Sequence, residues 1–190
     1  MDLNCLALAC SPRKNGNTAV LANKALEGCR DSGGKTELLY LSDYSYSPCR
    51  ACNACAATGK CVIKDDSEQL FNKILACDRF ILAAPIFSMG ICAQAKSFID
   101  RSQQFWAYKY ILGKKLFDNS QRKGIFISCA GTKLPNVFDG ALQVARYFFL
   151  MMEIELVSTC CYPGIDHIGD IQKTPASLQK VYDLGKKLGS

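Results

Sequence analysis

The chain has 190 residues, of which 49% are hydrophobic and 21% are charged, a composition typical of a soluble globular protein. A chain of this length is expected to form one domain over residues 1–190. No apolar run approaches the roughly 20 residues of a membrane span, and the N-terminus lacks the pattern of a signal peptide. We therefore expect a cytoplasmic protein with no membrane partner. The 23 basic and 17 acidic residues give a net charge of +6, but they form no basic block, so we expect no nucleic-acid partner.

Apolar segments alternate with longer amphipathic ones, which is typical of a parallel sheet covered by helices on both faces. Strands are predicted at Leu3–Ala9, Thr36–Leu41, Arg79–Ala84, Gly124–Cys129 and Ile154–Cys161. Helices are predicted at Asn17–Asp31, Asp65–Cys77, Cys92–Gln104, Pro135–Met152 and Pro175–Leu188. The alternation predicts an α/β fold, a flavodoxin-like doubly wound sheet of five parallel strands in the order 2-1-3-4-5. The fifth strand alternates apolar and polar residues, which suits an edge position. Asp65 and Glu68 have the spacing of a capping box at the start of the second helix.

The segment after the first strand has the chemistry of an anion site. It reads Ser11-Pro12-Arg13-Lys14-Asn15-Gly16-Asn17-Thr18 and leads directly into the first helix, whose N-terminus offers N–H groups to an anion. Ser11, Asn17 and Thr18 can add donors, and Arg13 can add charge. Gly16 permits a left-handed backbone that would turn the amides inward. Because the loop matches neither the dinucleotide nor the nucleotide-hydrolase motif, it fits a single terminal phosphate better than a pyrophosphate. An ordinary polar turn with a helix cap is the alternative.

The segment after the third strand is apolar although it should lie at the carboxyl edge of the sheet. It reads Pro85-Ile86-Phe87-Ser88-Met89-Gly90-Ile91. An apolar loop in that position suits a flat heterocyclic ligand, with N–H groups and Ser88 at its polar rim. The alternative is a loop that packs on the neighbouring helix.

Residues Asp43–Lys64 show neither helical nor strand periodicity, and a loop this long in a compact domain is usually functional. Within it, Cys49, Cys52, Cys55 and Cys61 form a C-x2-C-x2-C-x5-C run. Ligands spaced this closely suit a [4Fe–4S] cluster, with Gly59 letting the chain turn back toward the fourth. Structural zinc, free thiols and a disulfide are the alternatives. The other eight of the twelve cysteines are expected to be core residues.

The sequence resembles the flavin-reductase branch of the flavodoxin-like proteins, the NADPH-dependent FMN reductase family. The motifs that carry the resemblance are Ser11-Pro12-Arg13 with Asn17-Thr18, Ala84-Pro85-Ile86-Phe87, and Phe98-Ile99-Asp100-Arg101. The resemblance implies that FMN is bound by three loops. Its phosphate would be held by Ser11, Arg13, Asn15, Asn17 and Thr18. Its ring would lie against Pro85, Ile86, Phe87, Ser88, Met89 and Gly90, with Ala130 and Gly131 approaching from the other side.

The cysteine spacing and the segment Gly59–Asp66 further resemble the iron–sulfur flavoproteins of this family. The resemblance implies an oxidoreductase that couples FMN to a [4Fe–4S] cluster, with the flavin N5 rather than a side chain carrying the chemistry. It also implies NAD(P)H as co-substrate or a ferredoxin-like electron carrier as partner, and a homodimer or homotetramer. The apolar segment Phe105–Leu112 is the expected subunit contact. The loop follows the second strand, so it should share a rim with the flavin.

Two other functions stay open. The first is a cluster-free, NAD(P)H-dependent FMN or quinone reductase. The second is a flavodoxin-like electron carrier without catalytic activity. Such carriers usually present an acidic docking face, and the net charge of +6 argues against one here.

Overall fold

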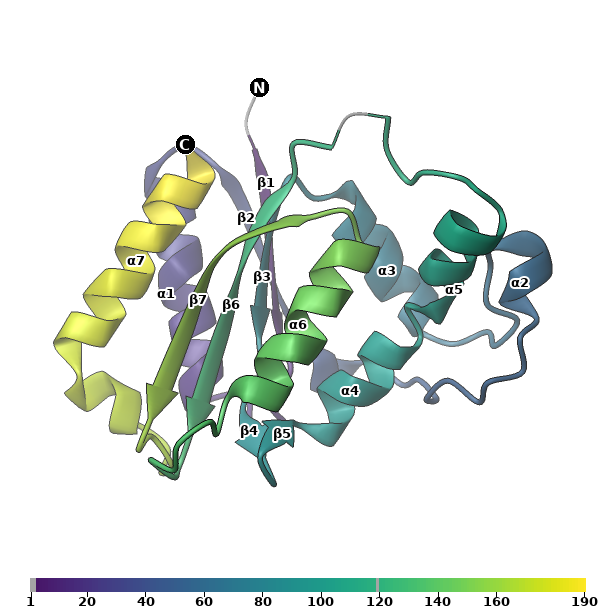
Figure 1. The fold of residues 1–190 in the computed structure, drawn as a ribbon. Helices are drawn as coiled ribbons and strands as arrows, with labels where there is room; N and C mark the ends of the chain where they lie inside the picture. Colours follow the sequence, from purple (N-terminus) through teal and green to yellow (C-terminus); the bar gives the residue numbers. More distant parts are fainter. Residues whose placement is uncertain (1–2, 119) are drawn as a thin grey trace.

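The computed structural model describes residues 3–118 and 120–190. Five parallel strands form one sheet in the order β2-β1-β3-β6-β7 (Figure 1). They are β1 (Asn4–Ala9), β2 (Lys35–Tyr40), β3 (Arg79–Ala83), β6 (Lys123–Ala130) and β7 (Glu155–Pro163). Counted among themselves, these strands have the order 2-1-3-4-5. The predicted fold class, strand order and edge position of the last strand are therefore confirmed.

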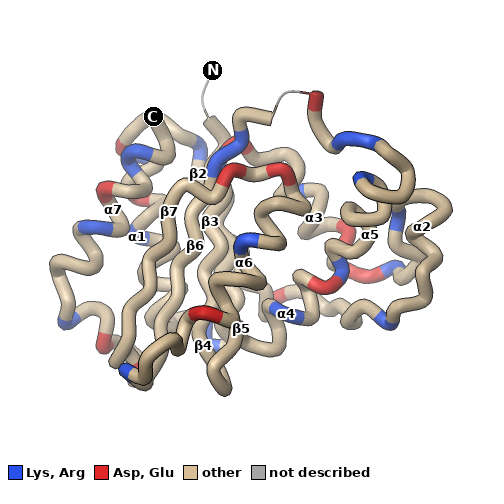
Figure 2. Tube along the Cα trace, viewed as in Figure 1, with Lys and Arg blue, Asp and Glu red and all other residues tan. Residues whose placement is uncertain are grey.

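Helices cover both faces of the sheet, as Figure 1 shows. One face carries α1 (Asn17–Asp31) and α7 (Pro175–Gly189), and the other carries α3 (Ser67–Ala76), α4 (Ala93–Asp100) and α6 (Asp139–Met151). Shorter elements are η1 (Leu41–Asp43), α2 (Cys55–Thr58), α5 (Gln103–Trp106), the π-helix η2 (Ala107–Ile111) and η3 (Asp170–Lys173). Within the described ranges, no helix is long and apolar enough to cross a membrane. Basic and acidic residues are interspersed over the helices and loops (Figure 2).

The central strands are apolar throughout because both of their faces are buried. Successive side chains of a strand point to opposite faces. Leu6 and Leu8 of β1 therefore join the core under α3, α4 and α6, and Ala7 joins the core under α1 and α7. The first of these cores holds most of the buried phenylalanines, including a stacked pair of Phe71 and Phe98 rings 4.5 Å apart. The two cores fix the sheet, and the carboxyl ends of its strands hold the loops of interest.

Two helix starts differ from the sequence prediction. The capping box is wrong, because α3 begins at Ser67 without a side-chain cap. The Asp65 carboxylate instead accepts hydrogen bonds from the Ser67 amide and from Arg101. The helix predicted over Cys92–Gln104 is divided into α4 and α5 by a turn at residues 101–102.

The sequence patterns also missed a small hairpin after β3. Its strands β4 (Ile86–Phe87) and β5 (Gly90–Ile91) are antiparallel and joined by Ser88 and Met89. Both joining residues have positive φ, 50° and 64°, which matches a two-residue turn of type I′. Asn-Gly and Asp-Gly are the usual sequences for this turn, so Ser-Met gave no signal.

Candidate functional site

A cavity of about 80 Å³ lies at the carboxyl ends of the strands. This is where open parallel sheets bind ligands. Four loops line the cavity: those after β1, β3, β6 and β7. The lining residues are Ser11, Arg13, Gly16, Asn17, Thr18, Pro85, Ile86, Phe87, Cys129, Gly131, Ile165, Asp166 and Ile168. The cavity has room for a phosphate group but not for a whole flavin, so a bound ring would lie on the rim.

The first turn of α1 is built to receive an anion. The helix has no side-chain cap and no acidic residue in its first turn, so the positive end of its dipole is uncompensated. Within the described part of the chain, the hydroxyl of Thr18 is buried and has no hydrogen-bond partner. Such a group costs about 1–3 kcal/mol unless it is satisfied. A phosphate oxygen in the cavity would supply the missing partner, so these residues fit the FMN phosphate that the sequence implies.

Asn17 and Asn15 are placed differently from the other predicted phosphate ligands. Asn17 lines the cavity, but its Nδ2 donates to the His167 carbonyl at 2.9 Å and its Oδ1 accepts from the Ile171 amide at 3.3 Å. Asn15 lies outside the cavity, in a hollow that it shares with Lys14. Asn17 therefore ties α1 to the loop after β7.

Gly16 is required for space rather than for a left-handed backbone. Its φ of −71° and ψ of 160° are extended, so the left-handed conformation that glycine permits is not adopted here. A Cβ at this position would lie 2.9 Å from the Arg13 carbonyl oxygen and 3.1 Å from the Ser11 hydroxyl. The turn is too tight for any side chain here.

The hairpin β4–β5 divides the predicted ring-binding residues into two groups. Pro85, Ile86 and Phe87 line the cavity, whereas Ser88, Met89 and Gly90 lie beyond it. The side chains of Phe87 and Met89 are 48% and 46% exposed. Large apolar groups exposed beside a polar cavity suit the cover of a flat ligand.

The loop after β7 contributes residues that the sequence patterns did not indicate. Ile165, Asp166 and Ile168 all line the cavity. Gly131 faces this loop so closely that a Cβ on it would lie 2.8 Å from the Asp166 Cγ. Ala130 does not line the cavity, and its carbonyl accepts a 2.9 Å hydrogen bond from the Ile165 amide. No local motif marks these residues, because their role depends on the β6–β7 pairing.

The cysteine loop begins at the carboxyl end of β2 and then packs on α5 and η2 (Figure 1). All twelve cysteines are free, and none of the four loop cysteines lines the cavity. Cys49 and Cys52 are exposed, and Cys55 and Cys61 are half-buried. The Cys61 amide donates to Gln104 Oε1 at 3.1 Å.

The backbone around these cysteines is unusual. Ala51 and Asn53, on either side of Cys52, have positive φ values of 52° and 56°. Backbone that alternates between right-handed and left-handed residues turns its N–H groups toward an anion. A hydrogen bond from the Ala54 amide lowers the pKa of Cys52. Gly59 ends α2 with φ of 71°, and a Cβ on it would lie 2.4 Å from the Tyr108 ring, so the predicted chain reversal there is confirmed.

The four thiols lie near one another but do not form a metal-binding arrangement. Burial raises the pKa of Cys55, and the nearby sulfurs of Cys61, Cys49 and Cys52 raise it further. Within residues 3–118 and 120–190, however, no three His, Cys, Asp or Glu side chains are gathered in a metal-binding arrangement. The structure therefore brings the four cysteines into one loop but does not preform a cluster site.

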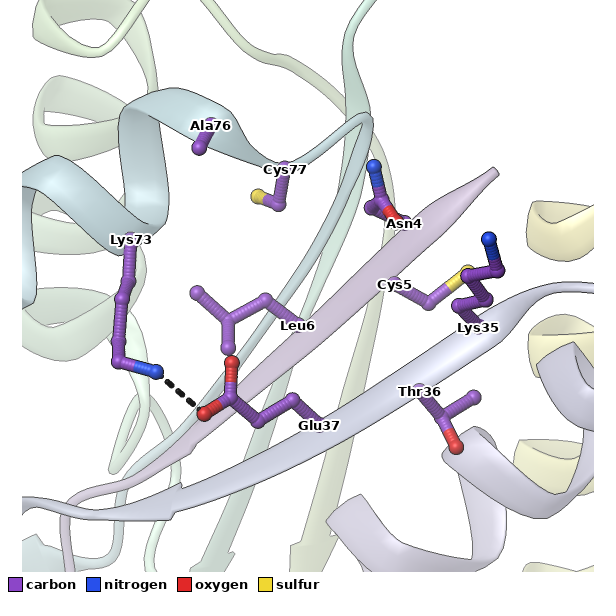
Figure 3. Close-up of a pocket in the computed structure, with 9 residues that line it drawn as sticks. All are labelled: Asn4, Cys5, Leu6, Lys35, Thr36, Glu37, Lys73, Ala76 and Cys77. Atoms are coloured by element: carbon purple, nitrogen blue, oxygen red, sulfur yellow. Dashed lines mark hydrogen bonds and ion pairs between the residues drawn. The ribbon is translucent and has the colours of Figure 1, made fainter. Parts of the chain in front are cut away.

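A second cavity, of about 320 Å³, lies at the opposite end of the sheet (Figure 3). Asn4, Cys5 and Leu6 of β1 form one wall, and an ion pair between Lys73 and Glu37 closes one side. It is lined by the start of β1 and β2 and the end of α3, so it lies away from the carboxyl edge where such sheets bind ligands. We do not assign it to the site.

Comparison with known proteins identifies the family. Residues 3–133 match the sequence profile of NADPH-dependent FMN reductases. The chain belongs to this family. An iron–sulfur flavoprotein of Methanocaldococcus jannaschii is 37% identical over 98% of this chain and 95% of its own, and one of Archaeoglobus fulgidus is 32% identical over 94% and 75%. Family membership makes the protein a flavin-dependent oxidoreductase, as the sequence predicted.

Solved structures share the fold at low sequence identity. An NAD(P)H:quinone oxidoreductase from Methanothermobacter marburgensis has a TM-score of 0.72 and 15% identity, covering 100% of this chain and 98% of its own. A flavone reductase has a TM-score of 0.74 and 16% identity, covering 98% and 62%. The flavodoxin-like architecture is therefore common to chains of quite different sequence.

Proposed function

We propose that the protein binds FMN at the carboxyl edge of the sheet and couples it to a [4Fe–4S] cluster held by Cys49, Cys52, Cys55 and Cys61. Bound flavin can exchange two electrons with NAD(P)H and single electrons with a cluster. The observation that carries the proposal is the four-cysteine run, set in a loop whose backbone suits thiolate ligands. The protein's own residues bind and orient the two groups, and no acid or base side chain is required.

The cavity residues divide the work of holding FMN. The α1 N-terminus, the Thr18 hydroxyl and the Arg13 guanidinium would hold the phosphate. Asp166 carries an acceptor, which suits the hydroxyl groups of the ribityl chain better than the phosphate. Phe87 and Met89 would cover the ring and keep water from one of its faces.

Several observations support the cluster. The spacing places three ligands within seven residues, and the alanines between them leave room for close approach. The positive φ at Ala51 and Asn53 costs energy that a bound anionic cluster would offset. Relatives named iron–sulfur flavoproteins match this chain over almost its full length.

The test is to replace each of the four cysteines with alanine in turn. Each variant should lose most of the iron of the reconstituted protein, since one open corner exposes the cluster to solvent. FMN content should stay at the wild-type level, because the flavin contacts lie on other loops. Cys160→Ala and Cys161→Ala, on β7, are the matched controls and should keep their iron. Retention of iron by the loop variants would contradict the ligand assignment.

A cluster-free NAD(P)H-dependent FMN or quinone reductase is the second candidate. The observation that favours it is that no three metal-binding side chains are gathered in the described residues. This function requires that alkylation of the four loop cysteines leave flavin reduction by NAD(P)H and quinone turnover unchanged. Loss of electron transfer to a one-electron acceptor after alkylation would favour the cluster.

We further propose that the chain assembles as a homodimer or homotetramer and exchanges electrons with a ferredoxin-like carrier. Tyr110 and Ile111 of η2 are 54% and 50% exposed, and Tyr147 and Leu150 of α6 are 48% and 51% exposed. Tyr147 and Tyr110 lie close enough to interact, so these exposed side chains of η2 and α6 are neighbours. A second copy of the chain would cover it.

A further inference from the structure

Arg101 is the most deeply buried charged side chain near the cysteine loop. It follows the last residue of α4, and its side chain is 1% exposed. Its Nη1 donates to the Ser47 carbonyl at 2.8 Å and to Asp65 Oδ2 at 2.7 Å, and its Nη2 donates to the Ile63 carbonyl at 3.1 Å. One side chain therefore joins residues on both sides of the four cysteines.

The Nε–H donor of this guanidinium takes no part in these hydrogen bonds. Within the part of the chain that the structure describes, the Arg101 Nε is buried and has no hydrogen-bond partner. A buried donor on a charged group is costly when it makes no hydrogen bond. The Cys61 thiol lies within interaction range of the guanidinium. Burial would lower the pKa of Arg101, but the hydrogen bond that it donates to Asp65 and the charges of Cys61 and Asp65 raise it.

A second link keeps Cys61 on this side of Arg101. Gln104 accepts from the Cys61 amide at 3.1 Å through Oε1 and donates to the Arg101 carbonyl at 3.3 Å through Nε2. The last cysteine of the run is thus fixed to the same turn of chain that carries the guanidinium. The other three cysteines have no comparable tie in the described residues.

We propose that Arg101 is a positioning residue for the cluster. It holds the two ends of the cysteine loop together and donates its Nε–H to the Cys61 sulfur once that sulfur is a cluster ligand. The second part rests on the proposed function, whereas the first does not. A hydrogen bond to a ligand sulfur stabilises the more negative, reduced cluster, so Arg101 raises the reduction potential.

An ordinary buried ion pair would not require this arrangement. Asp65 alone would neutralise the charge, yet the guanidinium also binds two carbonyls 16 positions apart in the chain, at Ser47 and Ile63. Replacement of a buried ion pair by apolar residues is often neutral for stability, so stability alone gives a weak reason for it. A loop that must present four thiols to one cluster needs its two ends held together, which is a specific reason for an arginine that binds both ends.

The test compares Arg101→Lys with Arg122→Lys. Lysine keeps the charge but loses the fork and the Nε donor. Arg122 is a matched control, because it is also a buried arginine and binds the carbonyls of Ile74, Cys77 and Met152, away from the loop. Two readouts are used: the alkylation rate of Cys61 in FMN-bound protein without cluster, and the midpoint potential of the reconstituted cluster.

In Arg101→Lys, Cys61 should be alkylated at least about fivefold faster than in the wild type. The midpoint potential of the cluster should be lower, and the FMN content should be unchanged. Arg122→Lys should change neither. If Arg101→Lys has the same Cys61 alkylation rate and the same midpoint potential as the wild type, the proposal is overturned. If the wild type takes up no iron, the proposed function is wrong, and the alkylation rates alone decide whether Arg101 holds the loop. If Arg101→Lys does not fold, Asp65→Asn should show the faster alkylation, and an unchanged rate in that variant would overturn the proposal.

Discussion

The side chain of Asn17 donates a 2.9 Å hydrogen bond to the carbonyl of His167, 150 positions further along the chain. Its other end accepts from the Ile171 amide. The first turn of α1 is thereby fixed to the loop after β7, which brings Asp166 to the cavity. The phosphate loop and the last loop of the sheet thus form one site. Asn17 acts within this site as a bridge between loops.

Arg13→Ala is expected to weaken FMN binding at least tenfold. A charge-assisted hydrogen bond is worth about 1.5–3 kcal/mol, and Arg13 is exposed, so its loss leaves the fold intact. Titration of the apoprotein with FMN measures the effect. Lys14→Ala is the control, because Lys14 pairs with Asp43 outside the cavity. An unchanged dissociation constant in Arg13→Ala would remove Arg13 from the site.

Thr18→Val separates binding from stability. Valine has nearly the shape of threonine but no hydroxyl, so the apoprotein loses only an unsatisfied group and should melt at the same temperature or higher. The FMN-bound form loses a hydrogen bond to phosphate, and its affinity should fall about tenfold for a loss of about 1.4 kcal/mol. Melting curves with and without FMN test both halves. If FMN raises the melting temperature of the wild type and the variant equally, the Thr18 hydroxyl does not bind the phosphate.

The fold was predictable because its signals are local. The five strands of the main sheet and the long helices that cover it follow from apolar periodicity, and the α1 boundaries Asn17–Asp31 agree with the pattern to the residue. Cavity residues were predictable where a local motif marks them, as at Ser11, Arg13 and Pro85. Ile165 and Asp166 escaped notice because chain pairing, and not a motif, brings them to the cavity. The hairpin at Ser88 and Met89 escaped notice because positive φ is uncommon outside glycine.

The ion pair of Asp65 and Arg101 should make stability sensitive to acid. Burial would raise the pKa of Asp65, but hydrogen bonds from Arg101, Ser47 and Ser67 lower it from 3.8 to about 2. A lowered pKa means that the contribution is complete above about pH 4 and is lost as the pH falls through about 2. Over this window the contribution is about 2 kcal/mol.

Urea unfolding of the wild type and Asp65→Asn between pH 6 and pH 2 measures this contribution. The variant should be about 3 kcal/mol less stable near neutral pH, because Arg101 is left buried without its partner. Its unfolding free energy should also change less with pH between about 4 and 2. Parallel pH profiles for the two proteins would show that Asp65 does not carry the acid sensitivity.

The apolar surface of Tyr110, Ile111, Tyr147 and Leu150 predicts an oligomer. Light scattering at micromolar concentration should give a dimer or tetramer of the 20.9 kDa chain. Leu150→Asp should shift the mass toward the monomer, whereas Leu134→Asp, at an exposed leucine after β6, should not. A monomeric wild type would exclude this surface as a subunit contact.

The central claim is that the cysteine loop holds a [4Fe–4S] cluster in a chain that also binds FMN. The most direct measurement is iron and sulfide content, with the visible spectrum, of protein purified and reconstituted without oxygen. A bound [4Fe–4S] cluster should give about four iron and about four sulfide per chain, with broad absorption at about 400 nm in addition to the flavin bands. Protein that holds FMN but less than about one iron per chain, without that absorption after reconstitution, would contradict the cluster and favour the cluster-free reductase.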